Sequence, residues 1–214
     1  MPTETKELLQ EAIQTIGEGK LKEAVSILEE LTQKAPEMIE AWYNYGYVLM
    51  ELGREEDAIK AFDEALAIDN MIFDIWFNKA NALYSIAGFE EAKKCYARAL
   101  EINEDDAEAW NNLGNCLSRL TEGQKAIEAY TRAVVLKPDY AEAFYNKANA
   151  HFIEEEDDRA IAYAEMAMEL NPDLEEKVKH WIHVSRDRMK SARDEIKHRE
   201  KQKILGRLVN EDNQ

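Results

Sequence analysis

The residues of this chain that are best suited to metal binding or proton transfer are histidines, and they are few. His180 and His183 lie three residues apart with Glu176 one turn earlier, so a helix would place three metal-ligand types on one face. No further ligand follows at a suitable spacing, and we therefore expect ordinary polar residues on a helix surface. His151 occupies an apolar position of its segment, where local packing explains it better than catalysis.

The other candidate groups also favour structural roles. Cys95 and Cys116 lie among aromatic and apolar neighbours, which is typical of small packing residues and not of nucleophiles. The acidic run 154–158 lacks the alternating oxygen spacing and the central glycine of a calcium loop. The sequence contains no G-x-S-x-G, P-loop, G-x-G-x-x-G or H-E-x-x-H motif. We predict a protein that is not an enzyme, with no catalytic residue, no metal and no cofactor.

Composition limits the kinds of protein that this chain can form. It has 214 residues, 45% of them hydrophobic, which suffices for a sizeable core and argues against disorder. Its net charge of −17 disfavours nucleic acid and anionic membranes as partners. No apolar run approaches the roughly 18 to 20 residues that cross a bilayer, and the N-terminus does not have the pattern of a secretory signal. We therefore predict a cytoplasmic protein.

A 34-residue repeat determines which elements carry these residues. Trp42, Trp76 and Trp110 are spaced by 34 residues, and alanine or glycine recurs at other positions with the same step. The small residues of two such positions are Ala12, Gly46, Ala80, Gly114 and Ala148, and Ala24, Ala58, Ala92, Ala126 and Ala160. The position that ends each unit holds Pro36, Asn70, Glu104, Pro138 and Pro172. Five units follow without insertion: 5–38, 39–72, 73–106, 107–140 and 141–174.

Each unit is predicted to form two amphipathic helices that pack antiparallel. In the fourth unit, Trp110, Leu113, Gly114 and Leu117 follow the spacing i, i+3, i+4, i+7, which places them on one helical face. The apolar residues of 126–134 repeat that spacing in the second helix. The small residues let the two helices approach closely, while a large side chain fills the space beside them.

This pattern resembles the tetratricopeptide repeat (TPR) family, whose signature is Trp-x2-Leu-Gly-x2-Tyr followed by Ala, an aromatic residue, Ala and Pro. The fourth unit carries the match with Trp110, Leu113, Gly114, Ala126, Tyr130, Ala133 and Pro138. Departures include Leu8 in place of Trp in the first unit, and Lys79 and Lys147 in place of Leu in the third and fifth. The resemblance implies an all-α fold, a right-handed superhelical solenoid of antiparallel helix pairs, over residues 5–174.

The resemblance also implies a binding surface, because the first helices of TPR units line a concave groove that holds an extended peptide. Asparagine offers a donor and an acceptor to a peptide backbone of any sequence, and flat aromatic residues suit binding hot spots. The predicted groove residues are Tyr43, Asn44, Tyr47, Phe77, Asn78, Asn81, Tyr84, Asn112, Asn115, Tyr145, Asn146, Asn149 and Phe152. Because these side chains are expected to face the groove, we expect folding to survive the replacement of Asn81, Asn115 and Asn149 together by alanine. The alternative is that they belong to the generic pattern of the family and that some aromatics pack between units.

The charges near this surface indicate the chemistry of a partner. TPR modules that bind a C-terminal carboxylate use Lys and Arg beside the groove asparagines, and the corresponding positions here are Leu9, Tyr43, Phe77, Asn111 and Tyr145. Acidic residues instead begin the first helices, at Glu40, Asp74, Glu108 and Glu142. They stabilise helix N-termini through the dipole, and if they face a ligand they favour a basic or mixed-charge one.

The C-terminal part differs from the repeats. Residues 175–209 are predicted to form a helix that caps the fifth unit through Val178, Trp181 and Ile182 and then continues beyond it, with a polar tail at 210–214. Residues 175–214 hold 11 Lys and Arg against 8 Asp and Glu, a net of +3. We predict an interaction module or scaffold that binds a protein or peptide, as a monomer or weak homodimer. The alternatives are self-association through this helix and an adaptor subunit of an enzyme complex.

Overall fold

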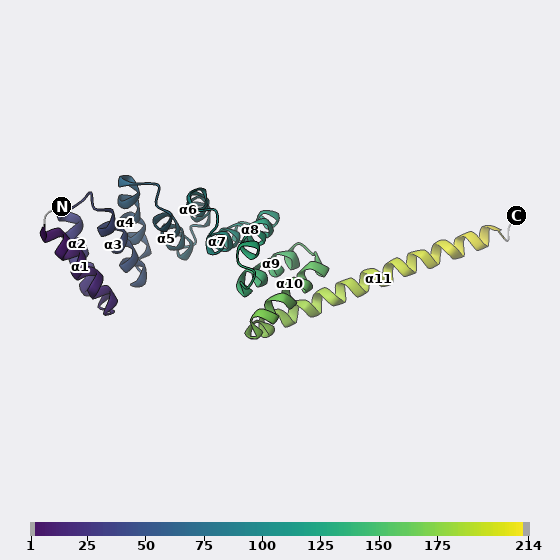
Figure 1. Ribbon diagram of the computed structural model, residues 1–214. Helices are drawn as coiled ribbons and strands as arrows, with labels where there is room; N and C mark the ends of the chain where they lie inside the picture. The colour runs from purple at the N-terminus through teal and green to yellow at the C-terminus, as the bar shows by residue number, and fades with distance from the viewer. Residues whose placement is uncertain (1–2, 212–214) are drawn as a thin grey trace. The chain divides into compact units, whose positions relative to one another are not determined.

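The computed structural model describes residues 3–211, with side chains for residues 4–203, and in this range it contains helices and turns but no strand. The fold class is therefore confirmed as an all-α repeat of antiparallel helix pairs (Figure 1). The chain is divided into two compact units, with the boundary between Leu136 and Lys137. The predicted domain boundaries stay a prediction, and residues 212–214 of the predicted polar tail lie outside the described residues.

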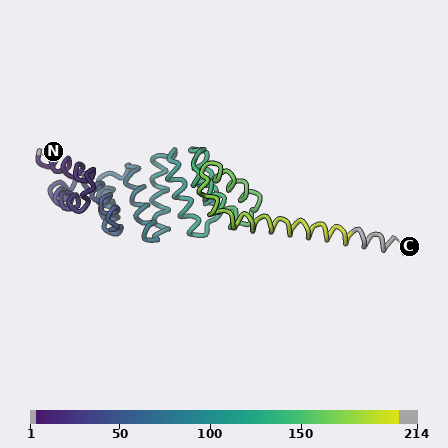
Figure 2. Tube along the Cα trace, turned by 90° about the horizontal axis from the view of Figure 1, so that it is seen from below, coloured from purple at the N-terminus to yellow at the C-terminus, as the bar shows by residue number. Residues whose placement is uncertain are grey.

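The first unit consists of four helix pairs that follow one another in chain order (Figure 2). The first helices of the pairs are α1 (Thr3–Gly17), α3 (Ile39–Glu51), α5 (Phe73–Ser85) and α7 (Ala107–Arg119). The second helices are α2 (Leu21–Lys34), α4 (Glu55–Ile68), α6 (Phe89–Ile102) and α8 (Gly123–Leu136).

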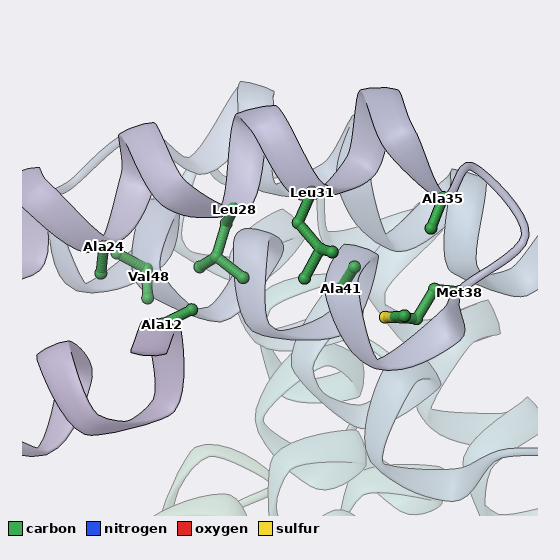
Figure 3. Packing of buried hydrophobic residues seen from close by; sticks show 8 residues of the cluster. All are labelled: Ala12, Ala24, Leu28, Leu31, Ala35, Met38, Ala41 and Val48. Atoms are coloured by element: carbon green, nitrogen blue, oxygen red, sulfur yellow. The ribbon is translucent and has the colours of Figure 1, made fainter. Parts of the chain in front are cut away.

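Small residues allow the close approach within each pair, as the repeat predicts. A Cβ atom placed on Gly46 of α3 would lie 2.6 Å from the ring of Phe62 in α4, and one on Gly114 of α7 would lie 2.5 Å from the ring of Tyr130 in α8. Between pairs, apolar side chains form the core. In Figure 3, Leu28 and Leu31 of α2 point toward the helix that carries Ala41, and both leucines are fully buried.

The tryptophan of each central pair holds the preceding connection in place. The indole Nε1 of Trp42 donates to the carbonyl of Pro36 at 2.8 Å, that of Trp76 to Asn70 at 2.9 Å, and that of Trp110 to Glu104 at 2.8 Å. All three acceptors occupy the position that ends a repeat. The 34-residue spacing of tryptophan therefore fixes how the second helix of one pair is connected to the first helix of the next.

The turn inside each pair uses a left-handed backbone conformation at one recurring position. Among the described residues, those with this conformation are Gly19, Gly53, Ala87, Thr121 and Glu155, with φ between 59° and 73°. They are 34 residues apart, so the repeat also sets the turn geometry. Glycine adopts this conformation without steric cost, and the other three residues adopt it because the helices on either side determine the turn.

The second unit contains α9 (Ala141–Ile153), α10 (Asp157–Leu170), a 3-10 turn (Pro172–Leu174) and α11 (Glu175–Glu211). The start of α11 covers the α9–α10 pair with Val178, Trp181 and Ile182, which are at most 8% exposed. The Trp181 ring lies 5.4 Å from the ring of Phe152 in α9. This part of α11 caps the pair, because its apolar face buries side chains that would otherwise contact water.

Beyond Ser185, α11 continues far past the helix pair that it covers (Figure 1). Its 37 residues correspond to about 55 Å of helix. Every side chain from Ser191 to Lys203 is exposed. Past Ser185, Arg188 still contacts the pair: its guanidinium donates to Asp157 at 2.6 Å and lies over the ring of Phe152.

Candidate functional site on the first helices

Polar contacts between successive first helices connect four of the predicted groove residues of the first unit. The amide Nδ2 of Asn78 in α5 donates to the hydroxyl of Tyr43 in α3 at 3.3 Å. The amide Nδ2 of Asn112 in α7 lies 3.5 Å from Oδ1 of Asn81 in α5. These contacts connect α3, α5 and α7, and we call their shared surface the first-helix face. Its predicted residues are Tyr43, Asn44, Tyr47, Phe77, Asn78, Asn81, Tyr84, Asn112 and Asn115.

Two of the asparagines also have a structural role that the sequence interpretation missed. Oδ1 of Asn81 accepts a hydrogen bond from the hydroxyl of Tyr96, and Oδ1 of Asn115 accepts one from Tyr130 at 2.9 Å. Both tyrosines are at most 2% exposed, so the amides satisfy hydroxyl groups that water does not reach. Asn81 and Asn115 therefore do not face only the predicted groove, and we expect alanine at either position to lower the stability of its helix pair.

The same hydrogen bonds orient the two amides. Because each Oδ1 faces a tyrosine hydroxyl, the Nδ2 group of Asn81 and of Asn115 is directed away from the tyrosine. Neither Nδ2 group donates a hydrogen bond within the described part of the chain. Each amide thus offers two N–H donors to an outside acceptor such as a peptide carbonyl.

A pocket of about 150 Å³ lies where these amides meet. It is lined by Asn81, Tyr84, Ser85, Tyr96, Asn112 and Asn115. Three amides and two aromatic rings at one small opening can accept a backbone carbonyl together with a small or flat side chain. Ser85 completes this lining and was not predicted, because its repeat position holds unlike residues in the other units, namely Gly17, Glu51, Arg119 and Ile153.

Asn44 and Asn78 each form a hydrogen bond with the backbone of their own helix. Nδ2 of Asn44 donates to the carbonyl of Glu40 at 2.6 Å, and that of Asn78 donates to the carbonyl of Asp74 at 2.8 Å. Both lie one turn after the carbonyl that they cap. Asn44 therefore contributes mainly its Oδ1 acceptor to the first-helix face.

Several predicted groove aromatics pack against neighbouring rings. Phe77 lies between Phe73 and Tyr96, with ring centroids 5.6 and 5.9 Å away. Tyr84 contacts Phe89 edge-on at 5.2 Å. Tyr47, in contrast, is 38% exposed. Phe77 and Tyr84 thus have the packing role considered for some of the aromatics, although both remain partly exposed to solvent. Tyr47 is the most exposed aromatic of the predicted groove residues.

The remaining predicted residues lie on α9 in the second unit. Phe152 packs between Trp181 and Arg188, and the Tyr145 ring lies 5.9 Å from the ammonium group of Lys177. Asn149 occupies the repeat position of Asn81 and Asn115, but the tyrosine position 15 residues later holds Ala164. The Asn149 amide therefore lacks the tyrosine partner of the other two, while Asn146 has a polar partner of its own.

Family models described as tetratricopeptide repeats match residues 15–71, 77–135 and 141–174, and a model described as a TPR repeat matches residues 124–152. The chain belongs to the TPR family. No curated protein matches its sequence significantly.

Solved structures show the same fold at low sequence identity. A crystal structure of MamA has 22% identity and a TM-score of 0.75, and the match covers 81% of this chain and 94% of MamA. MamA residues 41-end from Desulfovibrio magneticus RS-1 give 22% identity and a TM-score of 0.77, covering 81% and 98%. YrrB, described as a TPR protein with an unusual peptide-binding site, has 22% sequence identity and a TM-score of 0.72, and the match covers 78% of this chain and 86% of YrrB. At this identity the similarity establishes the TPR fold.

Lys79 and Lys147, which stand in place of the leucine of the repeat signature, are engaged in packing. Lys79 forms an ion pair with Asp63 and lies over the ring of Trp76. Lys147, only 5% exposed, lies 4.0 Å over the ring of Tyr163. Neither lysine is therefore free to bind the carboxylate of a peptide terminus, which agrees with the absence of that clamp from the sequence.

Of the candidate chemical residues, His180 and His183 are exposed, whereas His151, Cys95 and Cys116 lie in packed positions. His151 stacks on Tyr163, and its Nδ1 lies 2.6 Å from a carboxylate oxygen of Glu156, while burial lowers its pKa. Burial raises the pKa of Cys116 to about 12 and also raises that of Cys95, so both thiols are poor nucleophiles. Among the described residues, no three His, Cys, Asp or Glu side chains gather as a metal site.

In the part of the chain that the structure describes, none of the helices has both the length and the apolar content needed to span a membrane.

Proposed function

We propose that this TPR chain is a non-catalytic interaction module that binds an extended segment of another protein on the first-helix face of α3, α5 and α7. One observation carries the proposal. The buried tyrosines Tyr96 and Tyr130 fix Asn81 and Asn115 so that their Nδ2 donors are available at the pocket between α5 and α7. Preorganised donors of this kind bind backbone carbonyls at a low entropic cost.

Other features support the same function. Membership of the TPR family favours a protein or peptide as the partner. The exposed Tyr47 and the accessible edge of Tyr84 offer flat apolar surface beside the amides. Asn149 and Tyr145 of α9 present the same residue types in the second unit, and we propose that they bind a protein segment there. A role as a scaffold and a location in the cytoplasm belong to this proposal and stay predictions from the sequence.

The test uses a substitution that preserves the structural hydrogen bond. In N81D/N115D, a carboxylate oxygen still accepts from each tyrosine hydroxyl, but the two Nδ2 donors are lost. Each lost hydrogen bond contributes about 0.5–1.5 kcal/mol to binding. Two of them predict a loss in affinity between about five-fold and about 150-fold. The partner is identified by co-purification and mass spectrometry and is then titrated by calorimetry against wild type and variant.

The control adds the same charge elsewhere. N70D/Q124E places two carboxylates at exposed positions outside the first-helix face. We expect wild-type affinity for this control and an unchanged circular dichroism spectrum for both variants. If N81D/N115D is well folded and binds the partner as wild type does, the first-helix face is not the binding surface.

A further inference from the structure

A second pocket on the first unit has a different chemistry from the amide pocket. It has a volume of about 200 Å³ and is lined by Ile39, Glu40 and Tyr43 of α3 with Ile72, Asp74 and Ile75 from the start of α5. Three isoleucines and the tyrosine ring make most of its wall apolar, whereas the two carboxylates are exposed. The pocket is therefore an apolar depression with two negative charges beside it.

The two carboxylates are not neutralised by the protein itself. Within the described residues, neither Glu40 nor Asp74 forms an ion pair, although many exposed acidic residues of the same unit do, such as Asp57 with Arg54 and Glu101 with Arg98. Residues 1–136 hold 13 Lys and Arg against 26 Asp and Glu, a net of −13. The surrounding field thus favours a cation at this position and opposes an anion.

Tyr43 connects this pocket to the first-helix face. Its hydroxyl accepts from Asn78 of α5, and its ring forms part of the pocket wall. Tyr43 and Asp74 line the pocket together. Burial raises the pKa of Tyr43, and the negative charge of Asp74 adds to that rise. A segment bound along the first-helix face would therefore pass the mouth of the pocket.

We infer that this pocket accepts a lysine side chain of the bound segment. The inference rests on the proposed function and specifies the chemistry of its partner. A lysine has an apolar stem of four methylene groups, which suits the isoleucine wall, and an ammonium group that stays at the mouth between Glu40 and Asp74. An acidic side chain would meet two like charges, and a purely apolar one would leave both carboxylates without a partner.

The geometry of the helices explains the carboxylates only in part. Glu40 and Asp74 lie in the first turns of α3 and α5, where negative charge stabilises the helix dipole. Glu108 and Glu142 fill the same position in α7 and α9 and serve the same purpose, yet neither lines this pocket. The pair on α3 and α5 combines the charges with the apolar depression of this pocket, whereas Glu108 and Glu142 do not line it, so these four residues provide a matched comparison.

The experiment uses capped amino acids as probes on the full chain. N-acetyl-lysine N-methylamide is titrated at low salt, and backbone amide shifts are followed by NMR. N-acetyl-norleucine N-methylamide has the same stem without the ammonium group and serves as the uncharged probe. We expect saturable shifts in residues 39–43 and 72–76, with the lysine probe binding about three- to ten-fold more tightly than the norleucine probe, since exposed ion pairs are individually weak.

Variants then assign the difference to the two carboxylates. E40Q/D74N should reduce lysine binding to the level of norleucine, whereas E108Q/E142Q removes the same net charge from the same helix positions and should leave it unchanged. Equal loss in both variants would mean that the general field and not this pocket binds the cation, and absence of saturable shifts at 39–43 would also refute the inference. Either result leaves the outcome of N81D/N115D unaffected, so the two proposals fail separately.

Discussion

The hydrogen bond between Asn81 and Tyr96 gives a quantitative prediction for stability. Asn81→Ala removes the acceptor of a hydroxyl whose residue is 1% exposed. Leaving a buried polar group without a partner costs about 1–3 kcal/mol. Alanine is a better helix former than asparagine by up to about 0.7 kcal/mol, which offsets part of this cost. We therefore expect the opening free energy of α5 and α6 to fall by about 0.5–2.5 kcal/mol.

Two further variants separate the hydrogen bond from other effects. N81A/Y96F removes both partners, so its stability should return to within about 1 kcal/mol of wild type, since no hydroxyl is left unsatisfied. Asn149→Ala is the matched control, because Ala164 stands where Asn81 and Asn115 face a tyrosine. It should be neutral or slightly stabilising for α9.

The assay is native-state hydrogen exchange of the full chain with peptide-level resolution. It measures the opening free energy of α5 and α6 separately from that of α9 and α10, which a single unfolding midpoint does not. If N81A were as stable as wild type, or if N81A/Y96F were no more stable than N81A, the hydroxyl of Tyr96 would have another acceptor. In that case the structural role assigned to Asn81 would be wrong.

Two other predictions concern α11. Trp181→Asp should open the second unit, because a charge in a position only 8% exposed costs several kcal/mol; unchanged exchange protection in residues 141–170 would contradict the capping role. The exposed stretch from Ser191 to Lys203 carries few apolar residues, so sedimentation at several concentrations should show a monomer or weak dimer. A dimer that persists at nanomolar concentration and is abolished by deleting residues 187–214 would contradict this second prediction.

The helix pairs could be predicted from the sequence because the same small and large side chains pack against each other in each repeat. Trp42, Trp76 and Trp110 recur every 34 residues, and the glycine or alanine opposite a large side chain marks where two helices must approach closely. The sequence also indicated that α11 caps a pair and then continues alone. These features depend on neighbours within one or two repeats, and periodic sequence patterns encode such local contacts well.

The role of each asparagine was decided by tertiary structure. Asn81, Asn115 and Asn149 are equivalent in the repeat, but only the first two face a tyrosine on the partner helix. A signal was present, since tyrosine follows 15 residues after Asn81 and Asn115 and not after Asn149. This spacing could be interpreted only with the tertiary structure, because the antiparallel packing of the two helices places the tyrosine hydroxyl beside the amide and so determines how the amide is oriented.

The pocket that we propose to accept a lysine side chain likewise could not be predicted from the sequence. The sequence shows Glu40 and Asp74 as helix-start charges equal to Glu108 and Glu142. The packing of α3 beside the start of α5 brings Ile39, Ile72 and Ile75 into one pocket together with Glu40 and Asp74. Repeat periodicity determines which residue types recur, whereas the depressions between neighbouring helices depend on side chains from separate repeats, and those combinations exist only once the chain has folded.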